Sequence, residues 1–335
     1  MKPRLGIVTG DPCGIGPEIV AKLVAAQDVH ERAGILVISD QWVFERAQKV
    51  ANTALDIQVV EDAGSLDLDA GPPALLACRT VSEADVRTGE ALAAGGRSAL
   101  ETLTRALALA RDNVIDAIVF APLNKFALHQ TGYGFSDELH WFAHQLDCTS
   151  NFGELNVLGD LWTSRVTSHV PLSDVVPLIT ADAIVAAVQL AHGALLSAGY
   201  ASPRIGVAAL NPHAGDGGLF GREEIDVIGP AVQTARDAGI EAQGPFAADT
   251  IFLRARDGDF DAIVTMYHDQ GQIAMKLMGF DSGVTVQGGL PVPITTPAHG
   301  TAFDIAGQGK ADVKAMRQAF FLAAAMGENR RATGA

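Results

Sequence analysis

The sequence of 335 residues is poor in cysteine and in charge, and it has no basic cluster. Its three cysteines, Cys13, Cys78 and Cys148, are widely spaced and form no CxxC pair, which suits a reducing compartment better than a disulfide framework. Charged residues make up 19% of the chain, and the formal net charge is -15. Such a field repels phosphate backbones and anionic lipid, so we expect neither nucleic acid nor membrane as a partner.

Long hydrophobic runs are also missing. The most apolar stretch, "AIVAAVQLAHGALL", is interrupted by Gln189, His192 and Gly193 and falls short of the roughly 18–20 apolar residues that a membrane span needs. The first residues, "MKPRLGIVTGDP", lack the apolar core of a signal peptide. We therefore expect a cytoplasmic protein.

Hydrophobic residues, at 48%, are abundant enough for large cores. Short β-branched runs such as "RLGIVTG", "ILVIS", "AIVFAP" and "DAIVTM" alternate with longer helical stretches such as "ETLTRALALARD". This alternation predicts an α/β protein with largely parallel strands that are covered on both faces.

Polar residues of types that can bind ligands or take part in catalysis follow several of the predicted strands. "GDPCGIGPE", "APLNK", "TSHVPL", "LNPHAGDGG" and "YHDQG" each begin just past an apolar run. In open parallel sheets the carboxyl ends of the strands form the ligand crevice. We therefore expect these segments to gather around one site.

Three histidines share this placement: His169, His213 and His268. Imidazole is the commonest metal ligand, and three of them leave positions open for a substrate. Asp249 and Asp269 are candidates to orient them from outside. The alternative is three unrelated loop histidines with hydrogen-bonded rings.

Two further features are ambiguous by themselves. The glycines of "GDPCGIGPE" could let backbone amides approach an anion, but they do not match the GxGxxG dinucleotide motif and could form a plain tight turn. Lys276, eight residues after His268, could act as an acid or base in an apolar setting or could be an exposed lysine.

The motifs together resemble the 4-hydroxythreonine-4-phosphate dehydrogenase (PdxA) family. "GDPCGIGPEI", "APLNK", "TSHVPL", "LNPHAGDGGLFGREE", "GPFAADT", "MYHDQG" and "HGTAFDIAGQGKAD" occur in the family's order along nearly the whole chain. The last segment is also similar to one in isocitrate and isopropylmalate dehydrogenases. The resemblance implies a two-domain α/β/α fold of that kind with an interdomain cleft. Residues 1–130 and 295–335 would form the domain near the nucleotide, and residues 131–294 the domain with most metal ligands and the dimer interface.

The resemblance also implies a set of site residues. His169, His213 and His268 fall on the family's metal ligands for a divalent ion (Zn, Mg, Mn or Co), and Lys276 falls on a substrate-contacting lysine. His299, Gly300 and Thr301 fall in the segment that approaches a bound NAD or NADP. From the residues themselves we also expect Lys276, Asp249 and Asp269 to be catalytic and Gly10, Asp11 and Gly14 to bind the cofactor. A homodimer with active sites near the subunit interface is implied as well.

The implied reaction oxidises a secondary alcohol of a small β-hydroxy acid by hydride transfer, and the resulting β-keto acid then loses CO2. A cation favours the alkoxide and later the enolate, so the chemistry agrees with three histidine ligands.

The chain departs from the phosphate-using members of this family at several substrate positions. A Gly-His-Thr run is replaced by Asp137, Glu138 and Leu139, an asparagine by Thr285, an arginine by Ile294 and an aspartate by Ala298. Loss of a bidentate cation and gain of carboxylates weaken phosphate binding.

These departures lead us to expect an unphosphorylated substrate, such as the carboxylated cis-dihydrodiol of terephthalate dihydrodiol dehydrogenase. The alternatives are 4-hydroxythreonine 4-phosphate or a related four-carbon sugar-acid phosphate. Outside the dehydrogenases, a metabolite sensor without catalysis and a metal hydrolase are alternatives, against which the retained histidines and "HGTAFDIAG" argue.

Overall fold

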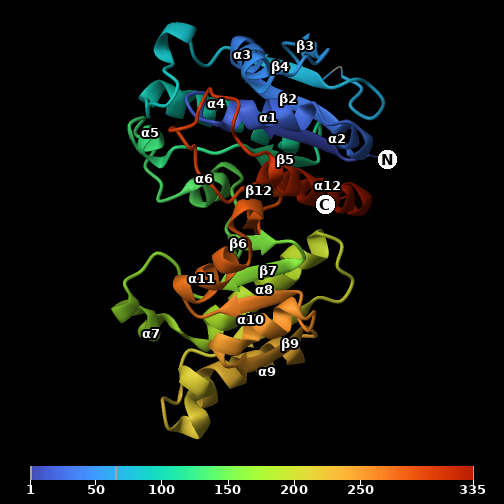
Figure 1. Cartoon of the computed structure of the whole chain (residues 1–335). Helices are drawn as coiled ribbons and strands as arrows, with labels where there is room; N and C mark the ends of the chain where they lie inside the picture. The colour runs from blue at the N-terminus through green and yellow to red at the C-terminus, as the bar shows by residue number, and fades with distance from the viewer. Residues whose placement is uncertain (1, 65, 335) are drawn as a thin grey trace. The chain divides into compact units, whose positions relative to one another are not determined.

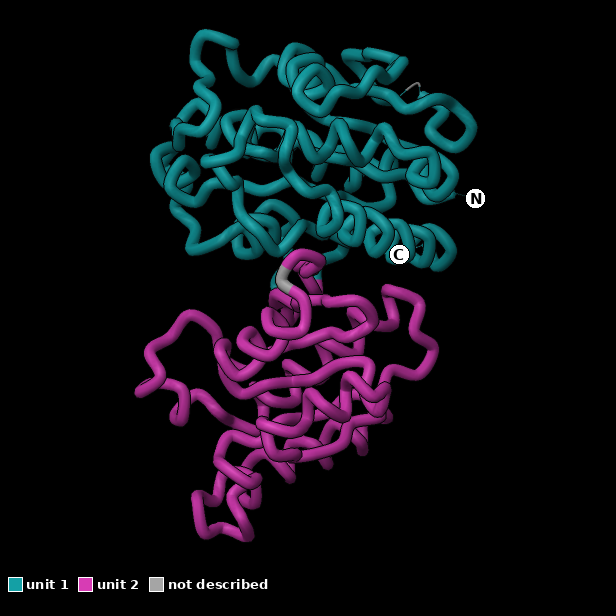
Figure 2. The backbone as a smooth tube through the Cα atoms, in the orientation of Figure 1, with its two compact units in different colours: residues 1–149, 290–335 teal, residues 150–289 magenta. Residues whose placement is uncertain are grey.

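The computed structural model describes residues 2–64 and 66–334, position 280 by its backbone alone. The chain divides into two compact units (Figure 2). Unit 1 comprises residues 1–149 and 290–335, and unit 2 comprises residues 150–289. We expected the first domain to end at 130 and to resume at 295. Trp141, Phe142 and Val292 pack in the core of unit 1, and for this reason the unit reaches residue 149 and resumes at 290.

Unit 1 is built on a parallel sheet whose strands, as far as they are described, run in the order β3-β4-β2-β1-β5-β12 (Figure 1). The strands are β1 (Arg4–Val8), β2 (Gly34–Asp40), β3 (Gln58–Val60), β4 (Ala74–Cys78), β5 (Ala117–Phe120) and β12 (Ile294–Pro297). Every residue of β2 and β5 is buried, because helices cover both faces of the sheet.

The helices of unit 1 connect these parallel strands. They are α1 (Gly16–Val24), α2 (Gln27–Arg32), α3 (Gln41–Ala51), the 3-10 turn η1 (Glu83–Asp85), α4 (Ala93–Arg111), α5 (Lys125–His129), α6 (Glu138–Gln145) and α12 (Lys314–Thr333). Helix α12 lies along β12, where Thr295 donates a hydrogen bond to the carbonyl of Ala319. The last helix therefore completes the core of the unit that the first residues begin.

Unit 2 contains a mixed sheet in the order β11-β6-β7-β10-β8-β9. Its strands are β6 (Gly153–Leu158), β7 (Leu161–Arg165), β8 (Arg204–Ala208), β9 (Glu241–Phe246), β10 (Ala262–Thr265) and β11 (Val284–Gly288). The pairs β11–β6 and β6–β7 are antiparallel, and the pairs from β7 through β10 and β8 to β9 are parallel. The carboxyl ends of β7, β8 and β10 therefore lie at the same end of the sheet.

The helical segments of unit 2 follow these strands. They are η2 (Leu172–Asp174), α7 (Val175–Leu178), α8 (Ala181–Ser197), η3 (Pro212–Gly218), η4 (Glu224–Ile228), α9 (Gly229–Asp237), α10 (Ala248–Arg256), α11 (His268–Gly279) and η5 (Phe280–Ser282). The segment of η3 and η4, in yellow, projects from the sheet of unit 2 (Figure 1).

The predicted α/β class with largely parallel strands is confirmed. Within the described residues no single helix has the length and apolar composition of a membrane span. One pair, Leu172–Leu178 with Ala181–Ser197, meets both criteria only when it is joined across a bend of 94°.

Candidate active site

Two of the three expected metal histidines lie side by side in unit 2. His169 follows β7, His268 begins α11 after β10, and their ring centroids are 5.7 Å apart. Nδ1 of His268 lies 2.7 Å from Oδ1 of Asp269. A carboxylate on one ring nitrogen fixes the imidazole and leaves the other nitrogen, Nε2, as a ligand. The pair therefore has the chemistry of a partial metal site.

His213 does not join this pair. It lies in η3, where the five residues 213–217 all have positive φ between 44° and 77°. Its ring contacts that of Phe220 at a centroid distance of 6.2 Å. Across the described residues no group of three or more His, Cys, Asp or Glu side chains converges as a metal site. A single chain thus presents two of the expected ligands together and the third apart.

Glu224 holds the unusual turn that carries His213. Its buried carboxylate accepts hydrogen bonds from the backbone N–H groups of Leu210 (2.9 Å) and Asn211 (2.7 Å). Burial by itself raises the pKa of Glu224, but the hydrogen bonds from Asn211 and Leu210 outweigh it and lower the pKa below the ordinary value. The charged carboxylate therefore fixes the start of the left-handed turn. Glu224 could not be singled out from the sequence, because no motif distinguishes it from its neighbour Glu223.

The remaining predicted catalytic side chains of unit 2 are exposed. Asp249 lies in the first turn of α10, and Lys276 lies two turns after His268 on α11. In the described part of the chain neither forms an ion pair. Thr285 on β11 is buried and accepts a hydrogen bond from Nδ2 of Asn156 at 3.3 Å.

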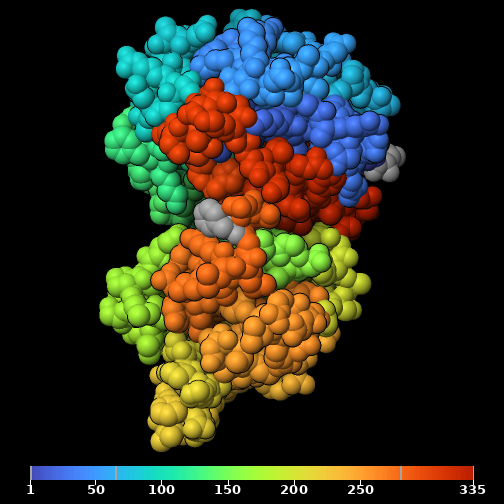
Figure 3. Space-filling model, viewed as in Figure 1, coloured from blue at the N-terminus to red at the C-terminus, as the bar shows by residue number. Residues whose placement is uncertain are grey.

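The two segments expected near the nucleotide meet in unit 1. The N–H of Ile15 donates to the carbonyl of Thr301 at 3.0 Å, and a Cβ on Gly14 would lie 2.9 Å from Cβ of Thr301. Gly10 has φ +71°, and a Cβ there would lie 2.4 Å from the carbonyl oxygen of Ala121. Glycine is thus required at Gly10, where the chain after β1 passes the backbone after β5, and at Gly14, where it passes Thr301. Figure 3 shows this orange-red region lying against the blue N-terminal residues.

Asp11 supports this turn from inside. Its side chain is 1% exposed, and Oδ1 accepts a hydrogen bond from the N–H of Cys13 at 2.9 Å. Oδ2 is buried and has no hydrogen-bond partner among the residues that the structure describes. Burial raises the pKa of Asp11 to about 6, although the hydrogen bond from Cys13 opposes the shift. The carboxyl group therefore faces the protein interior rather than the surface.

A buried ion pair ties the rest of the glycine-rich segment to α1. Glu18 accepts hydrogen bonds from the N–H of Ala311 (2.8 Å) and of Gly309 (3.3 Å). Nζ of Lys22 donates to Glu18 and to the carbonyls of Gly309 and Ala311, at 2.7–2.9 Å. The segment after Thr301 is thus held at four backbone groups. His299 and Gly300 lie at its exposed start.

Three substrate positions of the sequence analysis also lie in unit 1. Ile294 is fully buried in the core, beside residues such as Phe120 and Phe142. Leu139 is 5% exposed in the first turn of α6, and Glu138 is half-buried before it. The apolar character of Ile294 and Leu139 follows from packing, so it says little about the charge of a substrate.

Comparison with known proteins supplies the family. Residues 31–323 match the family model "Pyridoxal phosphate biosynthetic protein PdxA". The chain belongs to the PdxA family. It is 54% identical over 331 residues to "Putative 4-hydroxythreonine-4-phosphate dehydrogenase 2" of Pseudomonas aeruginosa, covering 98% of each chain. It is 39% identical over 318 residues to D-threonate 4-phosphate dehydrogenase of Cupriavidus necator, covering 95% of each.

Solved structures support the same family assignment. The crystal structure of 4-hydroxythreonine-4-phosphate dehydrogenase from Klebsiella pneumoniae matches with a TM-score of 0.85 at 34% identity, covering 98% of each chain. A terephthalate 1,2-cis-dihydrodiol dehydrogenase from Burkholderia xenovorans matches with a TM-score of 0.69 at 29% identity, covering 96% of this chain and 98% of that one. The chain is therefore a PdxA-family dehydrogenase, whose nicotinamide cofactor follows from the family.

Proposed function

We propose that the protein oxidises a phosphorylated four-carbon hydroxy acid with NAD or NADP. Its substrate would be 4-hydroxythreonine 4-phosphate or D-threonate 4-phosphate. The observation that carries this proposal is the 54% identity, over 98% of both chains, to a protein named for the first of these substrates. The relative from Cupriavidus necator supplies the second candidate.

This proposal replaces the expectation of an unphosphorylated substrate. That expectation gains no support from the comparisons, in which the dihydrodiol dehydrogenase is the more distant likeness at 29% identity. Its main argument was the replacement of an arginine by Ile294. Because Ile294 is a core residue of unit 1, its side chain reports packing and gives no reason to exclude a phosphate.

The proposed metal ligands are His169 and His268 of one subunit and His213 of a second copy. Two observations support this division. His213 lies apart from the other two in a single chain, and the described residues contain no cluster of three or more His, Cys, Asp or Glu side chains that could hold a metal ion. The projecting segment around His213 also exposes Leu219, Phe220 and Ile225, at 72%, 47% and 46%. Exposed apolar side chains in one segment suit a protein contact.

Each of the other predicted catalytic residues would have its own role in the proposed reaction. Asp269 orients His268 through Nδ1. Lys276, on the same helix, would carry a proton at Nζ and contact the substrate carboxylate. When bound, a divalent cation would polarise the substrate hydroxyl and stabilise negative charge that develops on oxidation and on loss of CO2. Asp249 would orient ligands or water from the start of α10.

The test is a paired assay of NADH and NADPH formation. The full-length protein is supplied in turn with Zn, Mg, Mn or Co and with 4-hydroxythreonine 4-phosphate, threonate 4-phosphate and both unphosphorylated acids. We expect turnover of a phosphorylated acid only. Preferential turnover of an unphosphorylated acid would overturn the proposed substrate class, and reduction of neither cofactor on any of these acids would overturn the proposed activity.

A further inference from the structure

One face of strands β6 and β7 in unit 2 is polar. The antiparallel register pairs Asn156 of β6 with Thr163 of β7. Glu154 and Arg165, each two residues away along its own strand, therefore extend from the same face. The opposite face carries buried apolar side chains, from Leu155, Val157 and Trp162. The polar residues thus form one group beside the end of β7, where the chain leads on to His169.

Arg165, the last residue of β7, is the centre of this group. Its side chain is 9% exposed, and each of its three guanidinium nitrogens donates to a different side chain. The acceptors are Oε2 of Glu154 at 2.7 Å, Oδ1 of Asn156 at 2.8 Å and Oγ of Ser168 at 2.9 Å. Because the guanidinium is planar and rigid, it holds the three partners at fixed directions from one another.

The bond to Ser168 supports the segment that carries His169. His169 has φ +51°, in the left-handed region that a residue with a Cβ keeps only where its surroundings hold it. Backbone pairing holds this segment as far as Thr167, whose N–H donates to the carbonyl of Met266 at 3.1 Å. The hydrogen bond from Nε of Arg165 to Ser168 extends the support to the residue next to His169.

The bond to Asn156 leads to the helix that carries His268. Oδ1 of Asn156 accepts a hydrogen bond from Arg165 and another from Nε2 of Gln272. Gln272 lies four residues after His268 on α11, and α11 lies against β7 (Figure 1). Residues four apart share one face of a helix, so the contact at Gln272 fixes the rotation of the turn that presents His268.

Stability alone does not explain this arrangement. Burial removes the charges of Arg165 and Glu154 from water, and apolar side chains of similar volume are often at least as stabilising as a buried ion pair. The opposite face of the same strands is packed in that apolar way. What the two routes from Arg165 have in common is that they end beside His169 and His268, whose ring centroids are 5.7 Å apart.

We propose that Arg165 is a positioning residue of the metal site, because its one guanidinium holds both segments that carry the neighbouring ligands His169 and His268. The inference rests on the proposed function, which supplies the metal ion. Its three main members, Arg165, Asn156 and Gln272, lie outside the sequence segments that carry the resemblance to the PdxA family. They become a group only through the register of β6 with β7 and the packing of α11.

The first experiment measures Zn binding by titration calorimetry with metal-free, full-length protein. Arg165→Met removes all three donors and keeps most of the length of the side chain. We expect it to weaken Zn binding by about 10- to 100-fold, as loss of a residue that orients metal ligands does. Arg165→Lys keeps the positive charge beside Glu154 but not the planar group with three donors, so it should recover only part of the loss.

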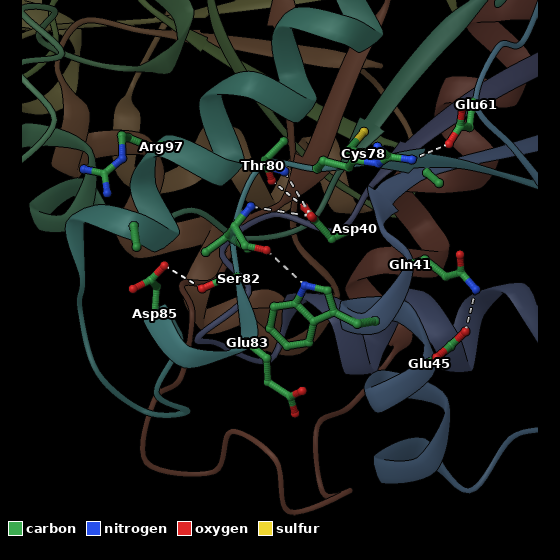
Figure 4. Close-up of a pocket in the computed structure, with 15 residues that line it drawn as sticks. Asp40, Gln41, Glu45, Glu61, Cys78, Thr80, Ser82, Glu83, Asp85 and Arg97 are labelled. Atoms are coloured by element: carbon green, nitrogen blue, oxygen red, sulfur yellow. Dashed lines mark hydrogen bonds and ion pairs between the residues drawn. The ribbon is translucent and has the colours of Figure 1, made fainter.

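Arg79→Met is the matched control. It also breaks an arginine–glutamate pair, since Arg79 lies 2.6 Å from Glu61. This pair is exposed and lies in unit 1, in the lining of a cavity of about 640 Å³ (Figure 4). Arg79→Met should therefore bind Zn as tightly as wild type does.

Hydrogen exchange in the metal-free protein gives a readout that does not depend on metal or activity. Arg165→Met should speed exchange of the backbone amides both in residues 166–169 and in residues 268–272. Gln272→Met keeps the pair of Arg165 and Glu154, and it should affect the second segment alone and weaken Zn binding less. Added to Arg165→Met, it should cause little further loss of Zn affinity, because both substitutions act through Asn156. Gln272→Met decides the question if Arg165→Met does not fold.

Turnover separates positioning from general destabilisation. In Arg165→Met, the Zn concentration that gives half-maximal activity should rise more than kcat at saturating Zn falls. If wild type binds Zn and the Arg165 and Gln272 variants bind it equally tightly, the inference fails and the proposed function stands. A loss of stability in urea with unchanged Zn affinity has the same meaning. If wild type binds none of Zn, Mg, Mn and Co, the proposed metal site and the inference fail together.

Discussion

The carboxylate of Glu18 lies 2.8 Å from the ammonium Nζ of Lys22, one turn further along α1. Both groups also hold the backbone at Gly309 and Ala311, nearly 300 residues away in the sequence. The pair therefore links the first helix to the glycine-rich segment that follows Thr301. A buried ion pair of this kind stabilises only while both charges and their hydrogen bonds are present.

Glu18→Gln should loosen this link. We expect a loss of about 1–3 kcal/mol in the free energy of unfolding, because a charged hydrogen-bond acceptor for two backbone N–H groups and Lys22 is replaced by a neutral one. KM for the cofactor should rise as the segment becomes less ordered. Urea unfolding and steady-state kinetics measure the two effects. Glu31→Gln, which removes an exposed carboxylate that accepts a hydrogen bond from Gln27, is the control. Equal stability of the two variants would contradict the prediction.

The buried carboxyl group of Asp11 should make the stability of the protein depend on pH. Its pKa of about 6 in the folded protein lies above the 3.8 of the unfolded chain, so the folded state holds the additional proton between these values. The free energy of unfolding should therefore fall as pH rises from about 4 through 6. The Asp11→Asn side chain cannot ionise, so the free energy of unfolding of this variant should change less with pH over this range. At neutral pH the variant should be more stable than wild type by up to about 3 kcal/mol.

Denaturant unfolding between about pH 4 and 7 checks this expectation. Asp182→Asn is the control, at an exposed position in the first turn of α8. Its free energy of unfolding should change with pH as that of wild type does. A wild-type slope that persists in Asp11→Asn would mean that another group titrates there.

The proposed division of the metal ligands between two copies predicts complementation. His213→Ala and His268→Ala should each lose metal and activity while keeping their fold. When the two variants are mixed and allowed to exchange subunits, half of a statistical population is mixed dimers, each with one intact site. About a quarter of the wild-type activity should return, as expected for a two-fold symmetric dimer. Absence of any recovery, with subunit exchange demonstrated, would place all three ligands in one chain.

The left-handed turn at His213 allows a matched pair of substitutions. Gly215 and Gly217 both have positive φ, +77° and +65°, so alanine is strained at either. A Cβ on Gly215 would also lie 2.7 Å from Oε2 of Glu224, whereas one on Gly217 meets nothing within 4 Å. Gly217→Ala should cost about 1 kcal/mol. Gly215→Ala should cost more and should weaken metal binding, measured by calorimetry with Zn. Identical behaviour of the two would show that the Glu224 contact does not position His213.

Much of the fold follows from local patterns in the sequence. The apolar runs before the glycine-rich turn, before "APLNK" and before His268 became β1, β5 and β10, because a continuous β-branched run has one stable place in a covered parallel sheet. The extent of unit 1 was less predictable. Residues 131–149 contain glycines and aromatics that suit a loop, and only the core shows Trp141 and Phe142 packed inside it.

Part of the candidate site could likewise be predicted from the sequence, and part could not. His169 and His268 follow adjacent parallel strands, β7 and β10, so strand order alone brings them together. The separation of His213 depends on a run of left-handed residues that no propensity predicts, since three of the five are not glycine.

The placement of β12 and α12 in unit 1 has a consequence for biosynthesis. Strand β12 pairs with β5 across more than 170 residues of intervening chain, and α12 closes the core last. Unit 2 is one continuous stretch, so all of it can leave the ribosome before residues 290–335 do. Unit 1 can complete its sheet and core only after residues 290–335 have emerged. Domains fold as they emerge. Nascent chains arrested with residues 150–289 outside the ribosome and residues 290–335 not yet outside it should therefore carry a protease-resistant middle and a protease-sensitive beginning.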